Sequence, residues 1–111
     1  MEAIARVKNL RGSARKARLV LDLIRGKKVT EAKKILAFSR QRMASNIQKL
    51  LDSAVANAID KNEKAEIDNM SVNLAYADDG RILRRFRARA QGRATVIRRR
   101  TCHITIGISQ K

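Results

Sequence analysis

Residues 81–100 read RILRRFRARAQGRATVIRRR, and nine of these residues are arginine. No Asp or Glu occurs from Gly80 to Lys111. Because like charges at this density repel one another and have no acidic partner within the segment, the stretch needs a polyanion, and nucleic acid is the best candidate. A guanidinium can fork onto a phosphate and also stack on an exposed base, so the preference for Arg over Lys favours RNA.

Alternating apolar residues on both sides of this stretch predict two β-strands. Their inward positions are Met70, Val72, Leu74 and Tyr76 in the first, and Cys102, Ile104, Ile106 and Ile108 in the second. Two such strands around one basic segment predict an antiparallel hairpin whose base lies in the core. With a turn at residues 90–92, about ten residues of each arm extend beyond the core, roughly 30–35 Å at about 3.3 Å per residue. A bare two-stranded ribbon is marginal in water, so we expect its partner to hold it in shape.

The N-terminal part of the chain predicts a strand followed by helices. Alternation at residues 3–7 predicts a short strand. A helix over residues 13–25 has Ser13 as its N-cap and Gly26 as its terminator. A second, shorter helix is expected to begin with Thr30 as its cap and to end near residue 38.

A third and longer helix is expected to begin at Ser39. Its apolar residues keep helical spacing for over four turns. They are Met43, Ile47, Leu50, Leu51, Ala54, Val55, Ala58 and Ile59. Residues 60–69 are polar and of mixed charge, which predicts a solvated connection.

The distribution of charge divides the chain in two. The formal net charge is +16 for 111 residues. Residues 1–79 contain 16 basic and 10 acidic side chains, net +6, whereas residues 80–111 contain ten basic and no acidic ones, net +10. This length predicts one domain. We expect a globular part at about residues 1–79 and 101–111, with an extended hairpin at about 80–100.

Several classes of protein are disfavoured by composition. The single cysteine, Cys102, excludes an intramolecular disulfide and a cysteine-based zinc site, and is expected in the core. No apolar run approaches the roughly 20 residues that span a bilayer, and the N-terminus lacks the features of a signal peptide. We therefore expect a soluble cytoplasmic protein without a membrane partner. Only 3% of residues are aromatic, which argues against an aromatic stacking platform.

The polar residues form no catalytic or metal-binding constellation. His103 is the only histidine, and we expect it to make a hydrogen bond or a phosphate contact from a strand. Asp78 and Asp79, beside Gly80, are too few for a metal site and instead mark where the strand leaves the domain. No Ser/His/Asp or Cys/His set is present, and the residues around Gly92 lack the Lys-Ser/Thr of a P-loop. We expect no enzyme activity, no metal and no cofactor.

Two groups of cations are candidates for RNA binding. The first lies in the N-terminal part: Arg6, Lys8, Arg11, Arg15, Lys16, Arg18, Arg25, Lys27 and Lys28. Within it, Arg11, Arg15 and Arg18 have the spacing of one helix face. The second lies in and beside the hairpin: Arg81, Arg84, Arg85, Arg87, Arg89, Arg93, Arg98, Arg99 and Arg100. His103 is a further candidate for RNA binding beside this group.

Two other functions are compatible with parts of the sequence. The helices at residues 13–25 and 30–38 could form a helix-turn-helix that reads DNA through Lys33 and Lys34. The second helix is short, however, has few side chains suited to reading bases, and leaves the basic hairpin without a role. A cationic membrane-active protein is the other alternative, but residues 81–100 lack the apolar stripe that it needs.

Several motifs resemble the L22 family of bacterial large-subunit ribosomal proteins. They are SARKARLV at residues 13–20, LIRGK at 23–27 with Ala32, DSAVANA at 52–58, and Arg84 followed by RAQGR at 89–93 and, nine residues later, HITI at 103–106. RRTCH at 99–103 extends the last match. The resemblance covers essentially the whole chain. Family members commonly have Pro before the Arg-Ala pair, where this chain has Ala88.

The resemblance implies an α+β fold with three helices packed on a small three-stranded antiparallel sheet and a long protruding basic hairpin. It implies binding to 23S rRNA, contacts with neighbouring large-subunit proteins, and no DNA partner. The globular part would lie near the solvent side of the nascent-peptide exit tunnel, on a ribosome in the cytoplasm. The hairpin tip would line the narrow part of the tunnel and meet the nascent polypeptide. By position, that tip is Arg87, Ala88, Arg89, Ala90, Gln91, Gly92 and Arg93.

Overall fold

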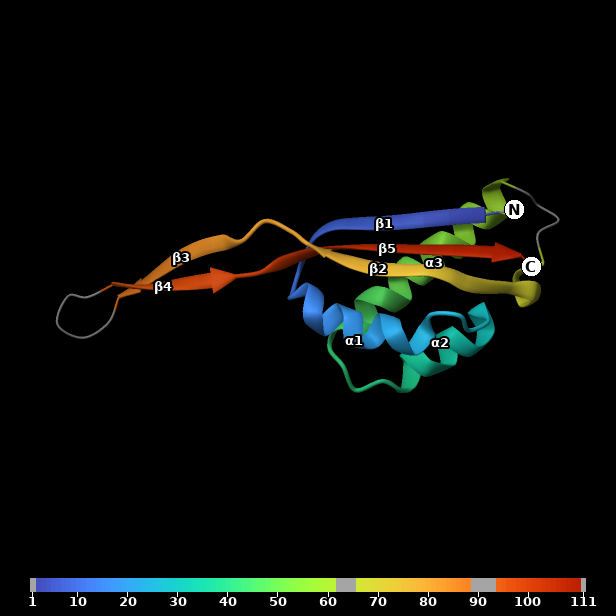
Figure 1. The fold of residues 1–111 in the computed structure, drawn as a ribbon, viewed down its shortest axis with the longest axis horizontal. Coiled ribbons are helices and arrows are strands. Elements are labelled where there is room, and N and C mark those ends of the chain that lie inside the picture. The colour runs from blue at the N-terminus through green and yellow to red at the C-terminus, as the bar shows by residue number, and fades with distance from the viewer. Residues whose placement is uncertain (1, 62–65, 89–93, 111) are drawn as a thin grey trace.

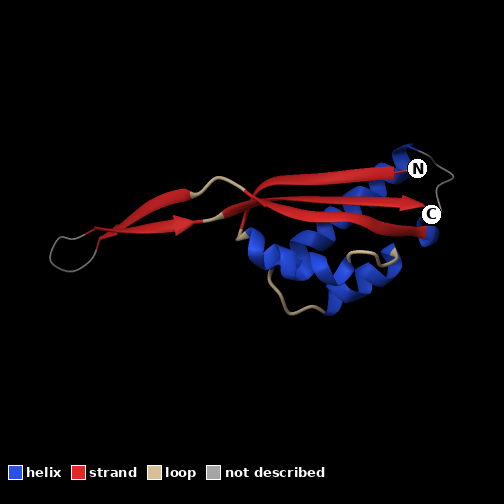
Figure 2. Ribbon diagram, viewed as in Figure 1, coloured by secondary structure: helices blue, strands red, loops and turns tan. Residues whose placement is uncertain are grey.

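Three helices cover one face of a three-stranded antiparallel sheet, and a two-stranded ribbon projects from the end of that sheet (Figures 1 and 2). The structure, a computed structural model, describes residues 2–61, 66–88 and 94–110. The elements in chain order are β1 (Glu2–Arg11), α1 (Ala14–Ile24), α2 (Val29–Phe38), α3 (Met43–Lys61), the 3-10 helix η1 (Ile67–Asn69), β2 (Met70–Asp79), β3 (Leu83–Ala88), β4 (Ala94–Arg99) and β5 (Thr101–Gln110). The sheet order is β1-β5-β2. The predicted α+β class is confirmed.

One long antiparallel hairpin supplies two of the three strands of the sheet, β2 and β5, and also the projection. β2 pairs with β5 as far as Asp79 opposite Cys102, and β3 pairs with β4 from Leu83 opposite Arg99 outward. The molecule measures 65 × 26 × 15 Å and has a radius of gyration of 17.1 Å, against about 13 Å for a compact domain of this length. The hairpin predicted with its base in the core is confirmed, while its predicted turn at residues 90–92 lies outside the described residues.

A β-bulge reverses the inward face of β2 part-way along the strand. The pairing with β5 shifts between Val72 and Leu74. Val72 is buried before this shift, whereas Ala75 and Ala77 are buried after it. The extra residue changes the parity of the alternation, so the following side chains exchange faces. The prediction that Leu74 and Tyr76 face the core is therefore wrong, and Tyr76 is 37% exposed.

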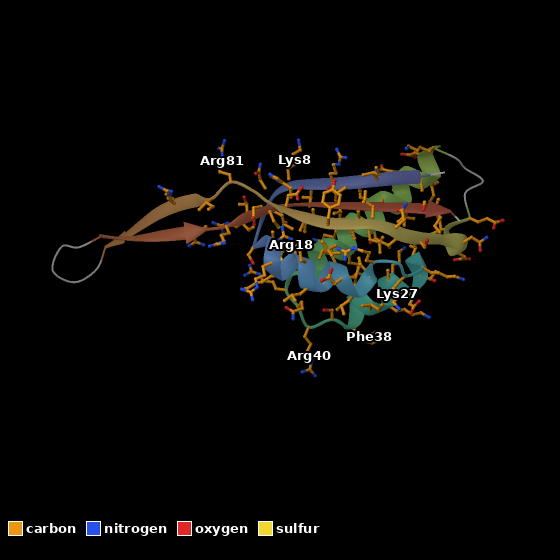
Figure 3. The ribbon with its side chains drawn as sticks, in the orientation of Figure 1. Lys8, Arg18, Lys27, Phe38, Arg40 and Arg81 are labelled. Atoms are coloured by element: carbon orange, nitrogen blue, oxygen red, sulfur yellow. The ribbon has the colours of Figure 1, made fainter. Side chains whose placement is uncertain are left out.

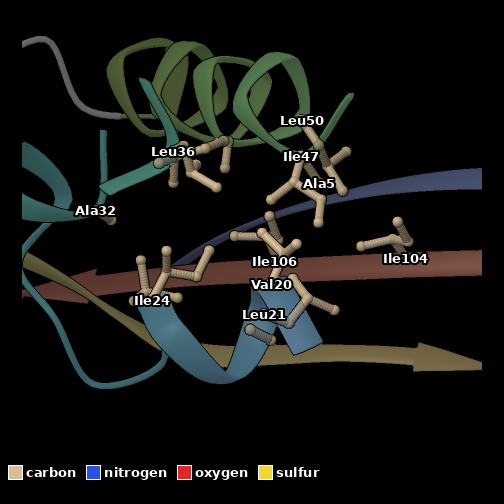
Figure 4. Packing of buried hydrophobic residues seen from close by; sticks show 14 of the residues in the cluster. Ala5, Val20, Leu21, Ile24, Ala32, Leu36, Ile47, Leu50, Ile104 and Ile106 are labelled. Atoms are coloured by element: carbon tan, nitrogen blue, oxygen red, sulfur yellow. The ribbon is translucent and has the colours of Figure 1, made fainter. Parts of the chain in front are cut away.

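The hydrophobic core lies between the sheet and the helices and centres on β5. The alternating side chains Cys102, Ile104, Ile106 and Ile108 are all fully buried, as predicted. Figure 4 shows Val20 and Leu21 of α1 and Ile47 of α3 close to Ile106. The large, fully buried side chains that the helices contribute are Val20, Leu21, Ile24, Val29, Ile47 and Leu51. Full burial of each such side chain stabilises the fold by about 1.5–3 kcal/mol.

Helix α1 begins and ends where its caps predict. The Ser13 hydroxyl oxygen accepts a hydrogen bond from the backbone N–H of Lys16 at 3.3 Å. Gly26 follows the helix with φ +82°, a left-handed conformation that favours glycine. The strand predicted at residues 3–7 is also confirmed, and β1 extends it to Arg11 through a bulge that includes Asn9 at φ 57°.

The starts of the other two helices differ from prediction. Helix α2 begins at Val29, and Thr30 is not its cap, because pairing of the 26–27 turn with Val72 places Lys28 at the N-cap. Ser39 does not start α3. It is the C-cap of α2, and its hydroxyl accepts a hydrogen bond from the N–H of Gln41 at 3.3 Å.

Helix α3 keeps most of its predicted apolar stripe. Met43, Ile47, Leu50, Leu51, Ala54 and Ala58 are buried, and Val55 is partly buried. Ile59 is 45% exposed, so its assignment to the inward face is wrong. The connection predicted at residues 60–69 is shorter at both ends, since α3 continues to Lys61 and η1 occupies Ile67–Asn69.

Candidate nucleic-acid interface

The projecting ribbon has only two described strands and carries many arginines. β3 and β4 form a two-stranded sheet of their own. Their register sets Arg84 directly opposite Arg98. Like charges directly opposite each other destabilise a strand pair, so this register favours an anionic partner.

The hairpin cations predicted from sequence fall in three places. Arg84, Arg85 and Arg87 belong to β3, Arg98 and Arg99 belong to β4, and Arg81 and Arg100 lie where the ribbon joins the sheet. Of the predicted tip, Arg87 and Ala88 end β3. Arg89, Ala90, Gln91, Gly92 and Arg93 lie outside the described residues.

Hydrogen bonds to backbone carbonyls stabilise the junction between ribbon and sheet, which we call the neck (residues 80–82 and 100–101). The Gly80 N–H donates to the Thr101 carbonyl at 2.9 Å, and the Thr101 hydroxyl donates to the Arg81 carbonyl at 2.5 Å. The N–H of Gly12, between β1 and α1, donates to the Arg100 carbonyl at 3.0 Å. The neck is therefore attached to the body through the β1–α1 turn.

A pocket of about 430 Å³ opens beside the neck, and we call it the neck pocket. Its lining includes five cations: Arg11, Lys16, Arg42, Arg99 and Arg100. The remaining described lining residues are Gly12, Ser13 and Met43, so no carboxylate is among them. Arg42 is not among the candidates predicted from sequence. The sequence predicts that the third helix begins at Ser39, and Arg42 belongs to no periodic pattern of charged residues.

The cations of α1 and of its C-cap, Arg25, have two different roles. Arg15 and Lys16 are exposed in the first turns. Arg18 and Arg25 instead turn to the outer edge of β2, where the Arg18 Nε donates to the Ala77 carbonyl at 3.0 Å. The prediction that Arg11, Arg15 and Arg18 share a helix face is wrong, because Arg11 ends β1 and precedes the helix.

The sheet face turned away from the helices carries a second, mixed cluster. A pocket of about 260 Å³ there is lined in part by Arg6, Lys8, Tyr76, Asp78 and His103. The His103 Nδ1 accepts a hydrogen bond from the Asn9 backbone N–H at 3.1 Å, so the strand-face hydrogen bond predicted for His103 is present. Sequence reasoning missed Tyr76 because the bulge that turns it outward has no signal in the alternation.

The described basic residues spread over the body. Figure 3 shows Lys8, Arg18 and Arg81 near the neck, and Lys27 farther towards the other end of the body. Lys27 and Lys28 are exposed in the turn between α1 and α2, which pairs with β2.

A family model for ribosomal protein L22p/L17e matches residues 5–109.

The chain belongs to the ribosomal protein L22p/L17e family. It is thus a structural ribosomal protein of the large subunit, it binds rRNA, and it acts in translation as part of a ribonucleoprotein. Other ribosomal proteins are among its partners. The L22p/L17e family is a structural, non-enzymatic one.

The helix-turn-helix alternative finds little support in this L22p/L17e family member. The Lys33 Nζ lies 3.5 Å from the Asp52 Oδ1, so one of the two side chains expected to reach DNA bases pairs with α3 instead. Helix α2 also packs against α1 and α3. It is therefore part of the body and does not project as a recognition helix.

Within residues 2–61, 66–88 and 94–110, no three His, Cys, Asp or Glu side chains gather as a metal ion would require. Over the same ranges, no helix has both the length and the apolar character needed to cross a membrane.

Proposed function

We propose that this protein binds 23S rRNA in a bacterial-type large ribosomal subunit in the cytoplasm. Its body lies on rRNA near the solvent-side exit of the nascent-peptide tunnel, and its hairpin, residues 80–100, extends inward along the tunnel wall. The tip, residues 87–93, lines the narrow part of the tunnel and faces the nascent polypeptide. Neighbouring large-subunit proteins contact the remaining surface of the body.

The observation that carries this proposal is a ribbon of one charge sign that forms a sheet of its own. With Arg84 opposite Arg98 and no acidic residue from Gly80 onward, the ribbon's own charges oppose its pairing. Next to rRNA phosphates the same positive charges become attractive. The ribbon can then join RNA segments that would otherwise repel each other.

The body supplies further phosphate contacts around the neck. Arg15 and Lys16 on α1 and Arg6 and Lys8 on β1 are exposed cations. Lys27 and Lys28 extend the basic surface towards the far end of the body. Arg18 and Arg25 contribute less to RNA binding than their sequence positions suggested, because their guanidinium groups already donate to β2 carbonyls.

Sedimentation tests the rRNA assignment. Tagged protein in a bacterial lysate should migrate with the large subunit in a sucrose gradient at moderate salt, and should be retained on purified 23S rRNA. Each phosphate contact contributes about 0.7–0.9 to the log–log salt slope of the binding constant. Protein that remains at the top of the gradient would overturn the assignment.

Site-specific cross-linking tests the tunnel assignment separately. A photoreactive phenylalanine analogue in place of Gln91 should cross-link to a nascent chain stalled in the tunnel, whereas the same analogue in place of exposed Lys34 should not. If subunits that contain the Gln91 variant yield no such product, the tunnel assignment fails while rRNA binding stands.

A further inference from the structure

The described lining of the neck pocket contains five cations and no carboxylate. Its five cations come from four segments: Arg11 from the end of β1, Lys16 from α1, Arg42 from the α2–α3 connection, and Arg99 and Arg100 from the hairpin side of the neck. Two ion pairs among the described residues, Arg25–Asp22 and Lys33–Asp52, lie outside this pocket. Asp and Glu are missing from the lining residues that the structure describes.

Tight packing brings these segments to one opening. Gly12 follows Arg11 with φ +136°, and a Cβ built on it would lie 2.8 Å from the Met43 Sδ. This close approach holds the end of β1 against the start of α3, just after Arg42. The Gly12 N–H bond to the Arg100 carbonyl then fixes the hairpin side of the same opening. The N-terminus of α1, at Ser13, adds partial positive charge.

The lining identifies the class of ligand. Guanidinium and ammonium groups recognise phosphate oxygens, and Arg can do so bidentately. The described lining contains no aromatic ring on which a base could stack. Contacts of this kind position a nucleic acid by its backbone and read no sequence.

We propose that the neck pocket binds backbone phosphate of rRNA and thereby fixes the direction of the hairpin relative to the body. This proposal rests on the proposed function. Arg11, Lys16 and Arg42 hold the phosphate from the body, and Arg99 and Arg100 hold it from the hairpin. The RNA thus supplies a link between body and hairpin in addition to the backbone hydrogen bonds of the neck.

Arg42 and Arg40 provide a matched pair of substitutions. Both are exposed residues of the α2–α3 connection, but Arg40 does not line the pocket, and its side chain points away from the body (Figure 3). R42Q should lower the log–log salt slope for 23S rRNA binding by about 0.7–0.9, the value of one phosphate contact, and R40Q should leave it unchanged. K16Q, on another wall of the pocket, should repeat the effect of R42Q, while R42K should restore much of the slope.

Two further measurements separate the possible results. Inorganic phosphate added to the free protein should shift the Gly12 and Arg100 amide resonances in the wild type and R40Q but not in R42Q. In the rRNA complex, spin labels at K34C and R84C should give a narrow distance distribution that R42Q broadens.

Each outcome decides a separate claim. A wild-type protein that does not bind 23S rRNA would overturn the proposed function itself. Normal wild-type binding with equal slopes for R42Q and R40Q would overturn the phosphate site alone. If R42Q lowers the salt slope but leaves the distance distribution between the two spin labels unchanged, the pocket binds phosphate but does not fix the direction of the hairpin.

Discussion

The Arg25 guanidinium donates two hydrogen bonds to the carbonyl oxygen of Ala75, from Nε at 3.1 Å and from Nη2 at 2.5 Å. Arg18, two turns earlier in α1, makes the equivalent bond to Ala77. Both carbonyls lie on the outer edge of β2, whose other edge pairs with β5. Unpaired carbonyls on an edge strand can form hydrogen bonds with another chain. Here Arg18 of α1 and its C-cap, Arg25, donate hydrogen bonds to two of these carbonyls. Two residues predicted to bind RNA thus have a structural role.

Substitution of Arg25 should reveal this role in the folding stability. Arg25→Ala should lower the free energy of unfolding by about 1–2 kcal/mol, because the Ala75 carbonyl loses two charge-assisted donors. Asp22→Ala removes only the exposed ion pair to Arg25, at 2.6 Å, and should cost less than about 0.5 kcal/mol. Urea denaturation of both variants measures the difference. Equal losses would assign the effect to the ion pair instead of the strand edge.

A side chain at Gly80 should lower the folding stability, because the neck leaves little space for a Cβ. A Cβ there would lie 2.6 Å from the Thr101 Oγ1 and 3.2 Å from the Thr101 backbone carbon. Gly80→Ala should therefore destabilise the protein by about 1–3 kcal/mol, as overpacking does. The penalty should shrink in a Thr101→Ala background, which removes the nearer atom. Thermal unfolding of the four proteins in this cycle measures the coupling, and additive costs would contradict the steric explanation.

Gly26 provides a contrasting case. A Cβ there meets nothing within 4 Å, but φ is +82°. Gly26→Ala should cost about 1 kcal/mol through backbone strain alone, and Gly26→Asn should cost less because Asn tolerates this conformation. Urea denaturation of both variants checks this order. If Asn proved as costly as Ala, strain at this φ would not be the cause.

Cys102 should be chemically inert until the protein unfolds. Burial, and then the carboxylate of Asp79, raise the pKa of the Cys102 thiol above the usual 9.0. The folded state therefore keeps this proton at a pH where the unfolded chain loses it, so the Cys102 contribution to stability is complete below about pH 9 and is lost as pH rises further. Reaction with a thiol-specific disulfide reagent at pH 8 should be slow in buffer and fast in denaturant.

A cysteine-free variant gives the control for this pH dependence. Cys102→Ala should decline less steeply in stability above pH 9 than the wild type, when both are measured by denaturant titration across pH. Rapid modification of the native protein, or identical pH profiles for the two proteins, would contradict the assignment of a buried neutral thiol.

Hydrogen exchange should distinguish the ribbon from the sheet. In the free protein, amides of β3 and β4 should exchange much faster than those of β5, which pairs with a strand on each side. Binding to 23S rRNA should slow exchange in β3 and β4. Equal protection of β4 and β5 without RNA would show that the ribbon does not depend on its partner.

Much of the fold could be predicted because its signals are local. The Ser13 cap, the Gly26 terminator, the buried stripe of α3 and the alternation of β5 each depend on residues within one element. The errors arose where one element depends on another. The start of α2 depends on the pairing of the 26–27 turn with Val72, and the outward turn of Tyr76 depends on a bulge in the register with β5.

The sequence by itself determined the element types, the core of β5 and the absence of acidic residues from Gly80 onward, because periodicity and composition are properties of the chain before it folds. Only the tertiary structure decided which cations already have partners and which do not. Arg25 donates to Ala75, whereas Arg42 and Arg100 line one pocket that has no carboxylate among its described lining residues. Both outcomes depend on the close approach of segments far apart in the chain, and packing of the shared core sets that approach.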